Sequence, residues 1–252
     1  MKNQDIIFGT RPVLESIKSG KTIERIFIQK NVVKETIQEI KLLASKYRLN
    51  ISLVPKEKLN RITRKNHQGI ICYISPISYQ PINEIIQRSY ENGKDPIVLI
   101  LDRVTDIRNF GSITRVAESA KVDAIIIPER GRALITSDSV KTSAGALNYV
   151  PICKVKSLKN TIKSLKDSGL NIVSCSDKAN KNIYSVDFKS PTAIILGSEK
   201  DGISENLLEL SNNQVKIPMF GKIDSLNVST SASIILYELI RQRLSSFNIC
   251  DF

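Results

Sequence analysis

The sequence of 252 residues lacks tryptophan, contains a single histidine and has only 6% aromatic residues. Its four cysteines, Cys72, Cys153, Cys175 and Cys250, lie far apart and form no CxxC pair. A zinc finger or a metal hydrolase needs clustered cysteine or histidine ligands, so both classes are excluded and we expect no bound metal. Sparse aromatics argue against a platform that stacks single-stranded bases. We expect the cysteines to be reduced, mostly buried thiols of a cytosolic protein.

Long apolar runs are also missing. No stretch approaches the roughly 18 residues that span a bilayer, and residues 1–12 contain no such run. The chain has neither GxGxxG after its first strand nor a GxxxxGKS or GxxxxGKT motif, so a classical dinucleotide fold and a P-loop are unsupported. We expect a soluble cytoplasmic protein with no membrane partner.

Acidic residues are outnumbered by basic ones, with 25 Asp and Glu against 37 Lys and Arg and a net charge of +12. The first 95 residues hold 17 basic and 9 acidic residues, a net +8, and the remainder hold 20 and 16, a net +4. This distribution favours a polyanionic partner that the N-terminal third grips. The alternative is that the lysines only keep the surface solvated.

Residues 1–75 are predicted to form a small α/β domain that binds RNA. Arg11-Pro12 places proline in the first turn of a helix that ends near Gly20. An amphipathic helix is expected from Val33 onward, and strands are expected at 23–29, 51–54 and 70–74.

A basic segment separates the last two of these strands. It contains Lys56, Lys58, Arg61, Arg64 and Lys65 and ends at His67-Gln68-Gly69, where glycine lets a backbone approach closely. Because such clusters suit phosphate contacts, we predict that RNA is bound by Arg11, Arg61, Arg64, Lys65, His67 and Gln68. The alternative for the cations is a solvated helix face. The only histidine, His67, could suggest general-base catalysis, but no acidic partner lies near it in sequence. We therefore expect His67 to contact RNA or to serve the turn.

Residues 76–95 are rich in proline and polar residues, which predicts a domain linker with a short helical patch at 82–86. Residues 96–252 then alternate strands and helices, which predicts a mostly parallel sheet covered on both faces. Strands are expected at 97–102, 123–128, 148–155, 171–174 and 192–196. A loop with Asn109 and Gly111 is expected to open a helix whose first turn bears Arg115.

Two bends are candidate ligand loops. Gly197 and Gly202 bracket a turn after the strand 192–196, and a strand at 215–219 leads through a polar loop into a helix. Parallel sheets bind ligands at the carboxyl ends of their strands, and N–H groups at a helix start hold polar ligands. The alternatives are that the glycines only make turns and that Asn227 or Ser229 only caps the helix.

Together these stretches resemble the SpoU (TrmH-like) family of RNA ribose 2′-O-methyltransferases, in the SPOUT superfamily, over nearly the whole chain. Asn109, Gly111 and Arg115 are similar to the first family motif, LGSEKDG at 196–202 to the second, and IPMFGKIDSLNVSTSA at 217–232 to the third. FGTRPVLE and NHQGI in the first 70 residues look like the substrate-binding domain of the subgroup that methylates a guanosine ribose in the peptidyl-transferase loop of 23S rRNA. The chain departs from the family at Ser112, where alanine is usual, and at Lys200-Asp201, where glycine often follows the glutamate.

The resemblance implies an L30e-like N-terminal α/β domain, a SPOUT α/β domain with a deep C-terminal trefoil knot, a homodimer, and S-adenosyl-L-methionine as cofactor. It implies that the cofactor is held by the backbone around Leu196, Gly197, Ile217, Met219 and Leu226. The residues implied to surround the reacting ribose are Asn109, Arg115, Glu199, Ser225 and Asn227.

The function predicted on this basis is 2′-O-methylation of a guanosine ribose in large-subunit (23S) rRNA. A guanidinium does not readily accept a proton, so we expect Arg115 to stabilise the developing alkoxide or to grip a phosphate. We expect Glu199 to orient Arg115 through a bidentate pair. The alternatives are a tRNA ribose methyltransferase of the same family and a non-catalytic rRNA-binding protein with a degenerate knot.

Overall fold

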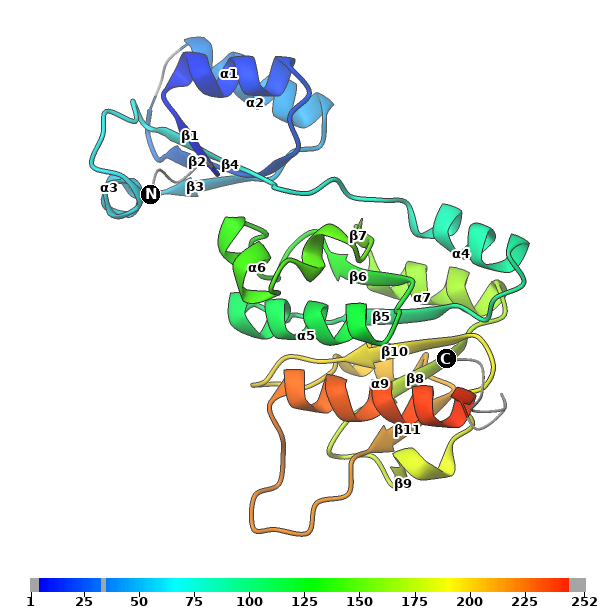
Figure 1. Ribbon diagram of the computed structural model, residues 1–252. Helices are drawn as coiled ribbons and strands as arrows, with labels where there is room; N and C mark the ends of the chain where they lie inside the picture. The colour runs from blue at the N-terminus through cyan, green and yellow to red at the C-terminus, as the bar shows by residue number, and fades with distance from the viewer. Residues whose placement is uncertain (1–4, 33–34, 245–252) are drawn as a thin grey trace. The chain divides into compact units, whose positions relative to one another are not determined.

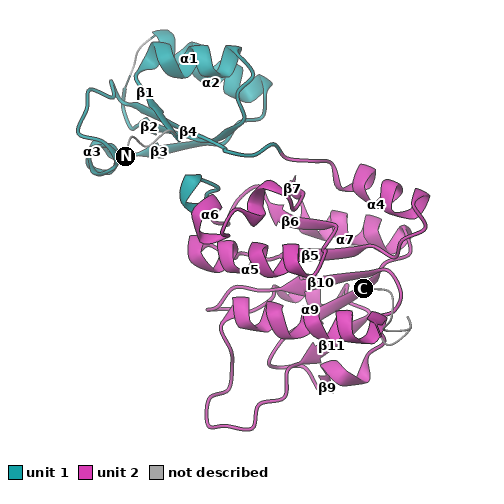
Figure 2. Cartoon of the chain, in the orientation of Figure 1, with its two compact units in different colours: residues 1–78, 134–138 teal, residues 79–133, 139–252 magenta. Residues whose placement is uncertain are grey.

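The structure, a computed structural model, describes residues 5–32 and 35–244 and divides into two compact units (Figures 1 and 2). Unit 1 comprises residues 1–78 and 134–138, and unit 2 comprises residues 79–133 and 139–252. Two residues named above, Val33 and Cys250, lie outside the described ranges. Within those ranges, no helix is both long and apolar enough to cross a bilayer.

Unit 1 is a four-stranded sheet with helices on both faces. Its elements are β1 (Ile6–Phe8), α1 (Thr10–Lys18), β2 (Ile23–Gln29), α2 (Glu35–Lys46), β3 (Ile51–Val54), α3 (Lys56–Ile62) and β4 (Ile70–Ile74). The strand order is β1-β4-β2-β3, with β2 and β3 parallel and the other two pairs antiparallel. α1 and α2 bury Val13, Ile37 and Ile40 on one face, and α3 buries Leu59 on the other. The α/β fold expected here is confirmed.

Unit 2 is built on a seven-stranded sheet in which every neighbouring pair is parallel, in the order β7-β6-β5-β10-β8-β11-β9. The strands are β5 (Ile97–Leu101), β6 (Ala124–Pro128), β7 (Ile152–Val155), β8 (Asn171–Cys175), β9 (Lys181–Asn182), β10 (Thr192–Leu196) and β11 (Asn213–Lys216). The helices after residue 78 are α4 (Ile82–Glu91), α5 (Ile107–Ser119), α6 (Ser137–Thr142), α7 (Leu158–Asp167), α8 (Glu205–Leu208) and α9 (Val228–Leu244), with short 3-10 helices at Ala146–Asn148 and Ile183–Ser185. The predicted parallel sheet is confirmed, and the trefoil knot stays a prediction.

Both faces of this sheet are covered, which explains why β5 and β10 are buried along their whole length and are apolar except at Thr192. Alternate strand residues, such as Val98, Ile100 and Ile195, pack in one core with α4, α7 and α8. On the opposite face α5 and α9 lie side by side (Figure 1). Therefore α5, which carries Asn109, and α9, which begins directly after Asn227, are neighbours on one face of the sheet.

Three elements differ from their sequence-based expectation. α4 lies inside the expected linker, and its Ile82, Ile85 and Ile86 pack into the core of unit 2 because they share one helix face. β7 begins only at Ile152, after the 3-10 turn that follows Gly145. β11 ends at Lys216 because Pro218 has no N–H for a sheet ladder.

A fourth difference concerns α5, which begins at Ile107 instead of after Gly111. The carboxylate of Asp106 caps the helix by accepting hydrogen bonds from the N–H groups of Arg108 and Asn109, at 2.7 and 2.9 Å. Gly111 consequently lies within the helix, on the side that packs against Thr142. A Cβ atom at Gly111 would overlap the side chain and backbone of Thr142.

Gly111→Ala is therefore expected to destabilise the protein, although alanine normally stabilises a helix interior by about 1 kcal/mol. We expect a net loss of about 2 kcal/mol in the free energy of unfolding, since a methyl group is forced into a filled space. Urea denaturation measures the change. The neighbouring exposed position provides the control: Ser112→Ala is expected to change stability by less than about 0.5 kcal/mol, and an equally harmless Gly111→Ala would contradict the packing argument.

Candidate active site

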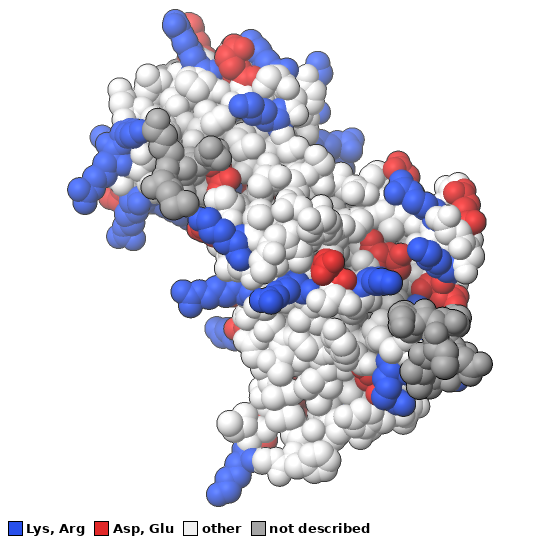
Figure 3. Space-filling model, in the orientation of Figure 1, with Lys and Arg blue, Asp and Glu red and all other residues white. Residues whose placement is uncertain are grey.

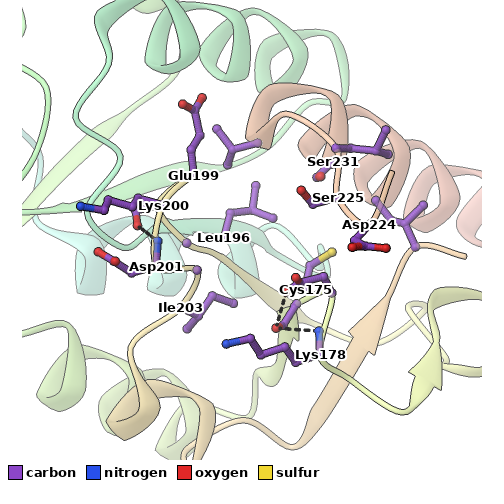
Figure 4. A pocket seen from close by; sticks show the side chains of 18 of the residues that line it. Cys175, Lys178, Leu196, Glu199, Lys200, Asp201, Ile203, Asp224, Ser225 and Ser231 are labelled. Carbon is purple, nitrogen blue, oxygen red and sulfur yellow. Dashed lines mark hydrogen bonds between the residues drawn. The ribbon is translucent and has the colours of Figure 1, made fainter. Parts of the chain in front are cut away.

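A pocket of about 240 Å³ opens at the carboxyl ends of β8, β10 and β11 (Figure 4). This is the edge at which parallel sheets bind ligands. The five residues predicted to hold a cofactor all line it: Leu196, Gly197, Ile217, Met219 and Leu226. Glu199 and Ser225, predicted to lie near the reacting ribose, line it too. The two candidate loops, 196–202 and 217–227, thus share one cavity.

The wall of the pocket after β10 is a tight turn. The N–H of Ser198 donates to the carbonyl of Gly202, and the N–H of Gly202 donates back to the carbonyl of Ser198, both at 3.0 Å. Gly197 has no room for a side chain, because a Cβ there would overlap the backbone of Gly202 and Ile203. Gly202 has φ +67°, in the left-handed region that glycine adopts readily. Both glycines are required by the turn that presents Glu199.

The carboxylate of Glu199 joins three segments that are far apart in the sequence. Its Oε1 accepts a hydrogen bond from the side-chain amide of Asn109, on α5, and another from that of Asn227, at 3.1 Å. The amide of Asn227 also donates to Oδ1 of Asn109 at 3.2 Å. The structure therefore brings together three of the five residues predicted to surround the ribose.

Asn227 also caps α9. Its Oδ1 accepts from the N–H and the hydroxyl of Ser229, at 2.8 and 2.6 Å, while its Nδ2 faces Glu199. The sequence left open whether Asn227 is a cap or a site residue. One amide both caps the helix and binds Glu199, because its oxygen and nitrogen point to different partners.

Arg115 lies apart from this cluster. It is exposed on α5, and among the residues that the structure describes no ion pair joins it to Glu199. The predicted bidentate pair is therefore wrong for this structure. Because α5 begins at Ile107, Arg115 lies in its third turn and not in its first. Arg115 lies six positions after Asn109, which corresponds to about 120° around the helix and about 9 Å along it.

Several pocket residues were not found from the sequence. Cys175 ends β8, Ser176, Asp177 and Lys178 follow it, and Asp224 belongs to the loop after β11 (Figure 4). Burial raises the pKa of the Cys175 thiol to about 12, with Asp177 adding to the rise, so the thiol is neutral and unreactive at physiological pH. These residues reach the pocket because β8 lies beside β10 in the sheet. No sequence motif predicts that the two strands are neighbours.

The predicted RNA-binding residues of unit 1 fall into two groups. Arg11, Arg61, Arg64 and Lys65 are exposed, and Lys and Arg side chains project from the surface around α3 (Figure 3). His67, in contrast, is only 6% exposed, and both of its ring nitrogens are hydrogen-bonded within the protein. Nε2 lies 2.9 Å from Oδ1 of Asn60, and Nδ1 accepts from the N–H of Gly69 at 3.0 Å. His67 therefore holds the turn before β4 in shape, and its contact with RNA stays a prediction.

Gln68 is engaged in a similar way. Its Oε1 accepts from both the N–H and the hydroxyl of Thr10, at 3.1 and 3.0 Å, and so joins the start of α1 to the turn before β4. Gln68 has φ +52°, a left-handed conformation that is unusual for a residue with a side chain. Its side-chain oxygen serves the fold of unit 1.

The described cysteines, Cys72, Cys153 and Cys175, are free thiols, and the first two are buried. Across residues 5–32 and 35–244, no cluster of three or more His, Cys, Asp or Glu side chains could hold a metal ion.

Comparison with known proteins identifies the class to which this chain belongs. Residues 96–237 match the SpoU rRNA methylase family, and residues 6–80 match the RNA 2′-O ribose methyltransferase substrate-binding domain. The fold and these matches define an RNA methyltransferase. More particularly, the chain belongs to the SpoU (TrmH-like) family.

Its relatives agree with this assignment. A Staphylococcus saprophyticus protein ascribed to the TrmH family of tRNA/rRNA methyltransferases is 37% identical over 238 residues, which cover 94% of this chain and 96% of the relative. The AdoMet-bound rRNA methyltransferase from Sinorhizobium meliloti matches 94% of this chain and 87% of its own, with a TM-score of 0.60 and 22% identity. The A. aeolicus TrmH/SpoU tRNA modifying enzyme is 27% identical with a TM-score of 0.56, and it covers only 66% of this chain and 85% of its own.

The hydrogen bonds of His67 predict a pH-dependent stability. Burial, with a smaller effect of Lys56, lowers the pKa of His67 below its usual 6.5, so folding favours the neutral ring. This stabilisation is present above the unfolded pKa and is lost as the pH falls through the lower folded pKa. Replacement of His67 by glutamine removes the acceptor for Gly69 and is expected to cost about 1 kcal/mol at neutral pH.

Urea denaturation of wild type and His67→Gln at about pH 7.5 and about pH 5.5 measures this effect. Because His67 is the only histidine, the wild type should lose more stability between the two values than the variant does. Equal losses in both proteins would show that the ring does not titrate differently in the folded chain.

Proposed function

We propose that the protein methylates the 2′-hydroxyl of a ribose in large-subunit rRNA, with guanosine as the target nucleotide and S-adenosyl-methionine as the methyl donor. The observation that carries the proposal is the meeting of Asn109, Glu199 and Asn227 at the rim of the pocket. Of these three side chains Glu199 lines the pocket, so we expect a ribose hydroxyl to meet the cluster at this carboxylate.

The pocket suits the donor in its chemistry. Leu196, Ile203 and Leu226 provide apolar walls for an adenine ring. In the described part of the chain, the N–H groups of Met219 and Leu226 make no backbone hydrogen bond, so they remain available to acceptors on that ring. The carboxylates of Asp177 and Asp224 offer acceptors for ribose hydroxyls. Once bound, S-adenosyl-methionine would supply an electrophilic methyl group.

Glu199 is suited to orienting the RNA ribose. Both amides donate to its Oε1, and among the described residues its Oε2 has no hydrogen-bond partner. Oε2 can accept from a ribose hydroxyl, while Asn109 and Asn227 prevent the carboxylate from rotating. Methyl transfer is an in-line displacement, so a fixed acceptor that aligns the attacking oxygen lowers the barrier.

Arg115 is assigned to charge stabilisation. Its guanidinium is free of Glu199 and exposed, so it is available to an RNA phosphate or to the oxygen that becomes negative as its proton leaves. A guanidinium donates hydrogen bonds and accepts none, which makes Arg115 unsuitable as the base. We therefore assign it to the transition state or to the neighbouring phosphate.

Large-subunit rRNA is favoured over tRNA by unit 1. Its residues match a substrate-binding domain, and Arg11, Arg61, Arg64 and Lys65 expose their charges to solvent. The similar tRNA modifying enzyme covers only 66% of this chain. A tRNA substrate remains the second candidate, because the Staphylococcus relative is ascribed to a family of tRNA/rRNA methyltransferases. We further propose a homodimer formed through unit 2, which sedimentation in solution tests.

Incubation with labelled S-adenosyl-methionine and either unmethylated large-subunit rRNA fragments or bulk tRNA tests the function. We expect label in the rRNA at a guanosine 2′-oxygen, located by mapping alkali-resistant linkages. Label in tRNA alone would establish the second candidate. Absence of calorimetric heat with S-adenosyl-methionine would identify a non-catalytic RNA-binding protein and overturn the proposal.

Arg115→Ala is expected to slow single-turnover methylation by about a hundredfold or more, because a developing negative charge loses its donor. Affinity for S-adenosyl-methionine should not change, since Arg115 does not line the pocket. Arg88, exposed on α4, provides the control, and Arg88→Ala should react at the wild-type rate. A rate within a few-fold of wild type for Arg115→Ala, with unchanged RNA binding, would remove the catalytic assignment.

A further inference from the structure

Arg103, two residues after the end of β5, has an unusual backbone conformation. Its φ is +57°, in the left-handed region where a side chain is disfavoured. A residue other than glycine keeps this conformation where the surrounding contacts compensate for it. The contacts of Arg103 therefore indicate what its conformation achieves.

The guanidinium of Arg103 reaches the turn that carries Glu199. Nη2 donates to the carbonyl of Gly202 at 3.2 Å, and Nη1 lies 3.4 Å from the carboxylate of Asp201. Nε donates to Asp102, whose carboxylate is almost completely buried. The same carboxylate accepts from the N–H and the hydroxyl of Ser204, at 2.7 and 2.6 Å.

These bonds attach the turn 198–202 to the end of β5. Arg103 holds the turn at Asp201 and Gly202, and Asp102 holds the chain just after it at Ser204. Within the turn, two backbone bonds join Ser198 and Gly202, and the N–H of Asp201 donates to the Ser198 hydroxyl. Such local bonds shape the turn but do not fix its place relative to the sheet. Asp102 and Arg103 supply that second restraint.

We propose that Arg103 is a positioning residue that clamps the turn 198–202 and thereby holds the pocket wall and Glu199 in place. This inference rests on the proposed function, since it assigns the clamp to a cofactor pocket. The planar guanidinium contacts three partners at once, whereas a lysine ammonium at the end of a flexible stem cannot reach all three. Charge alone is therefore insufficient.

The test compares Arg103→Gly and Arg103→Lys with wild type. Glycine removes the clamp and accepts the left-handed backbone, so the chain should still fold, as circular dichroism and the melting temperature verify. Both variants should bind S-adenosyl-methionine about tenfold more weakly in calorimetry, because the turn must be ordered on binding. RNA affinity should stay at the wild-type value. Lys121→Gly is the matched control: Lys121 also has a left-handed φ, of +50°, but lies between α5 and β6 away from the turn.

Hydrogen exchange separates failure of the clamp from failure of the proposed function. The amides of Ser198 and Gly202 should exchange faster in both Arg103 variants, with protection of β5 and β10 unchanged. If wild type binds no S-adenosyl-methionine, the proposed function fails, and the exchange rates still decide whether the clamp exists. If wild type binds it while Arg103→Gly retains affinity within about twofold and shows unchanged exchange, the clamp is overturned.

Discussion

The site depends on the hydrogen bonds between the carboxylate of Glu199 and the amides of Asn109 and Asn227. They join the turn after β10 to the first turn of α5 and to the start of α9, three segments that only the tertiary fold brings together. Neutral amides can surround a carboxylate without cancelling its charge. The cluster therefore keeps a charged hydrogen-bond acceptor in a fixed direction at the rim of the pocket. A strong ion pair with an arginine would neutralise the charge of this carboxylate.

Limited space is a second constraint, on the turn after β10 and on α5. Gly197 and Gly111 both lie where any side chain would overlap a neighbouring backbone, one against Gly202 and the other against Thr142. Glycine costs a helix or a strand about 1 kcal/mol through backbone entropy. The packing that glycine permits offsets this cost, because it lets α5 and the turn after β10, which carry Asn109 and Glu199, pack closely against their neighbours. The glycines of the motifs thus act through packing, and the asparagines and the glutamate act through hydrogen bonds.

Much of this arrangement was predictable from the sequence. The apolar strands, their alternation with helices and the two candidate loops follow from local pattern, and Leu196, Ile217 and Leu226 do line one pocket. The sequence predicted a later start for α5, because Asn109 and Gly111 are residues typical of loops. The helix begins earlier because Asp106 caps it. Strand order was not predictable, since nothing local states that β8 lies between β10 and β11. The contribution of residues 175–178 to the pocket followed only from that order.

Polar residues were harder to assign than apolar ones, because their roles depend on partners distant in sequence. Gln68 is bonded to Thr10, 58 residues away, and Arg103 to Gly202, 99 residues away. A basic or amide side chain in a loop looks the same in sequence whether it faces solvent, RNA or another loop.

The distribution of charge has a consequence for the proposed reaction. The first 95 residues hold a net +8, whereas the polar cluster beside the pocket consists of two neutral amides and one carboxylate. Contacts between cations and phosphates weaken steeply with salt because binding releases counterions, but hydrogen bonds to a fixed carboxylate change little. RNA affinity and the geometry of methyl transfer are thus governed by different groups, and salt should affect the first far more than the second.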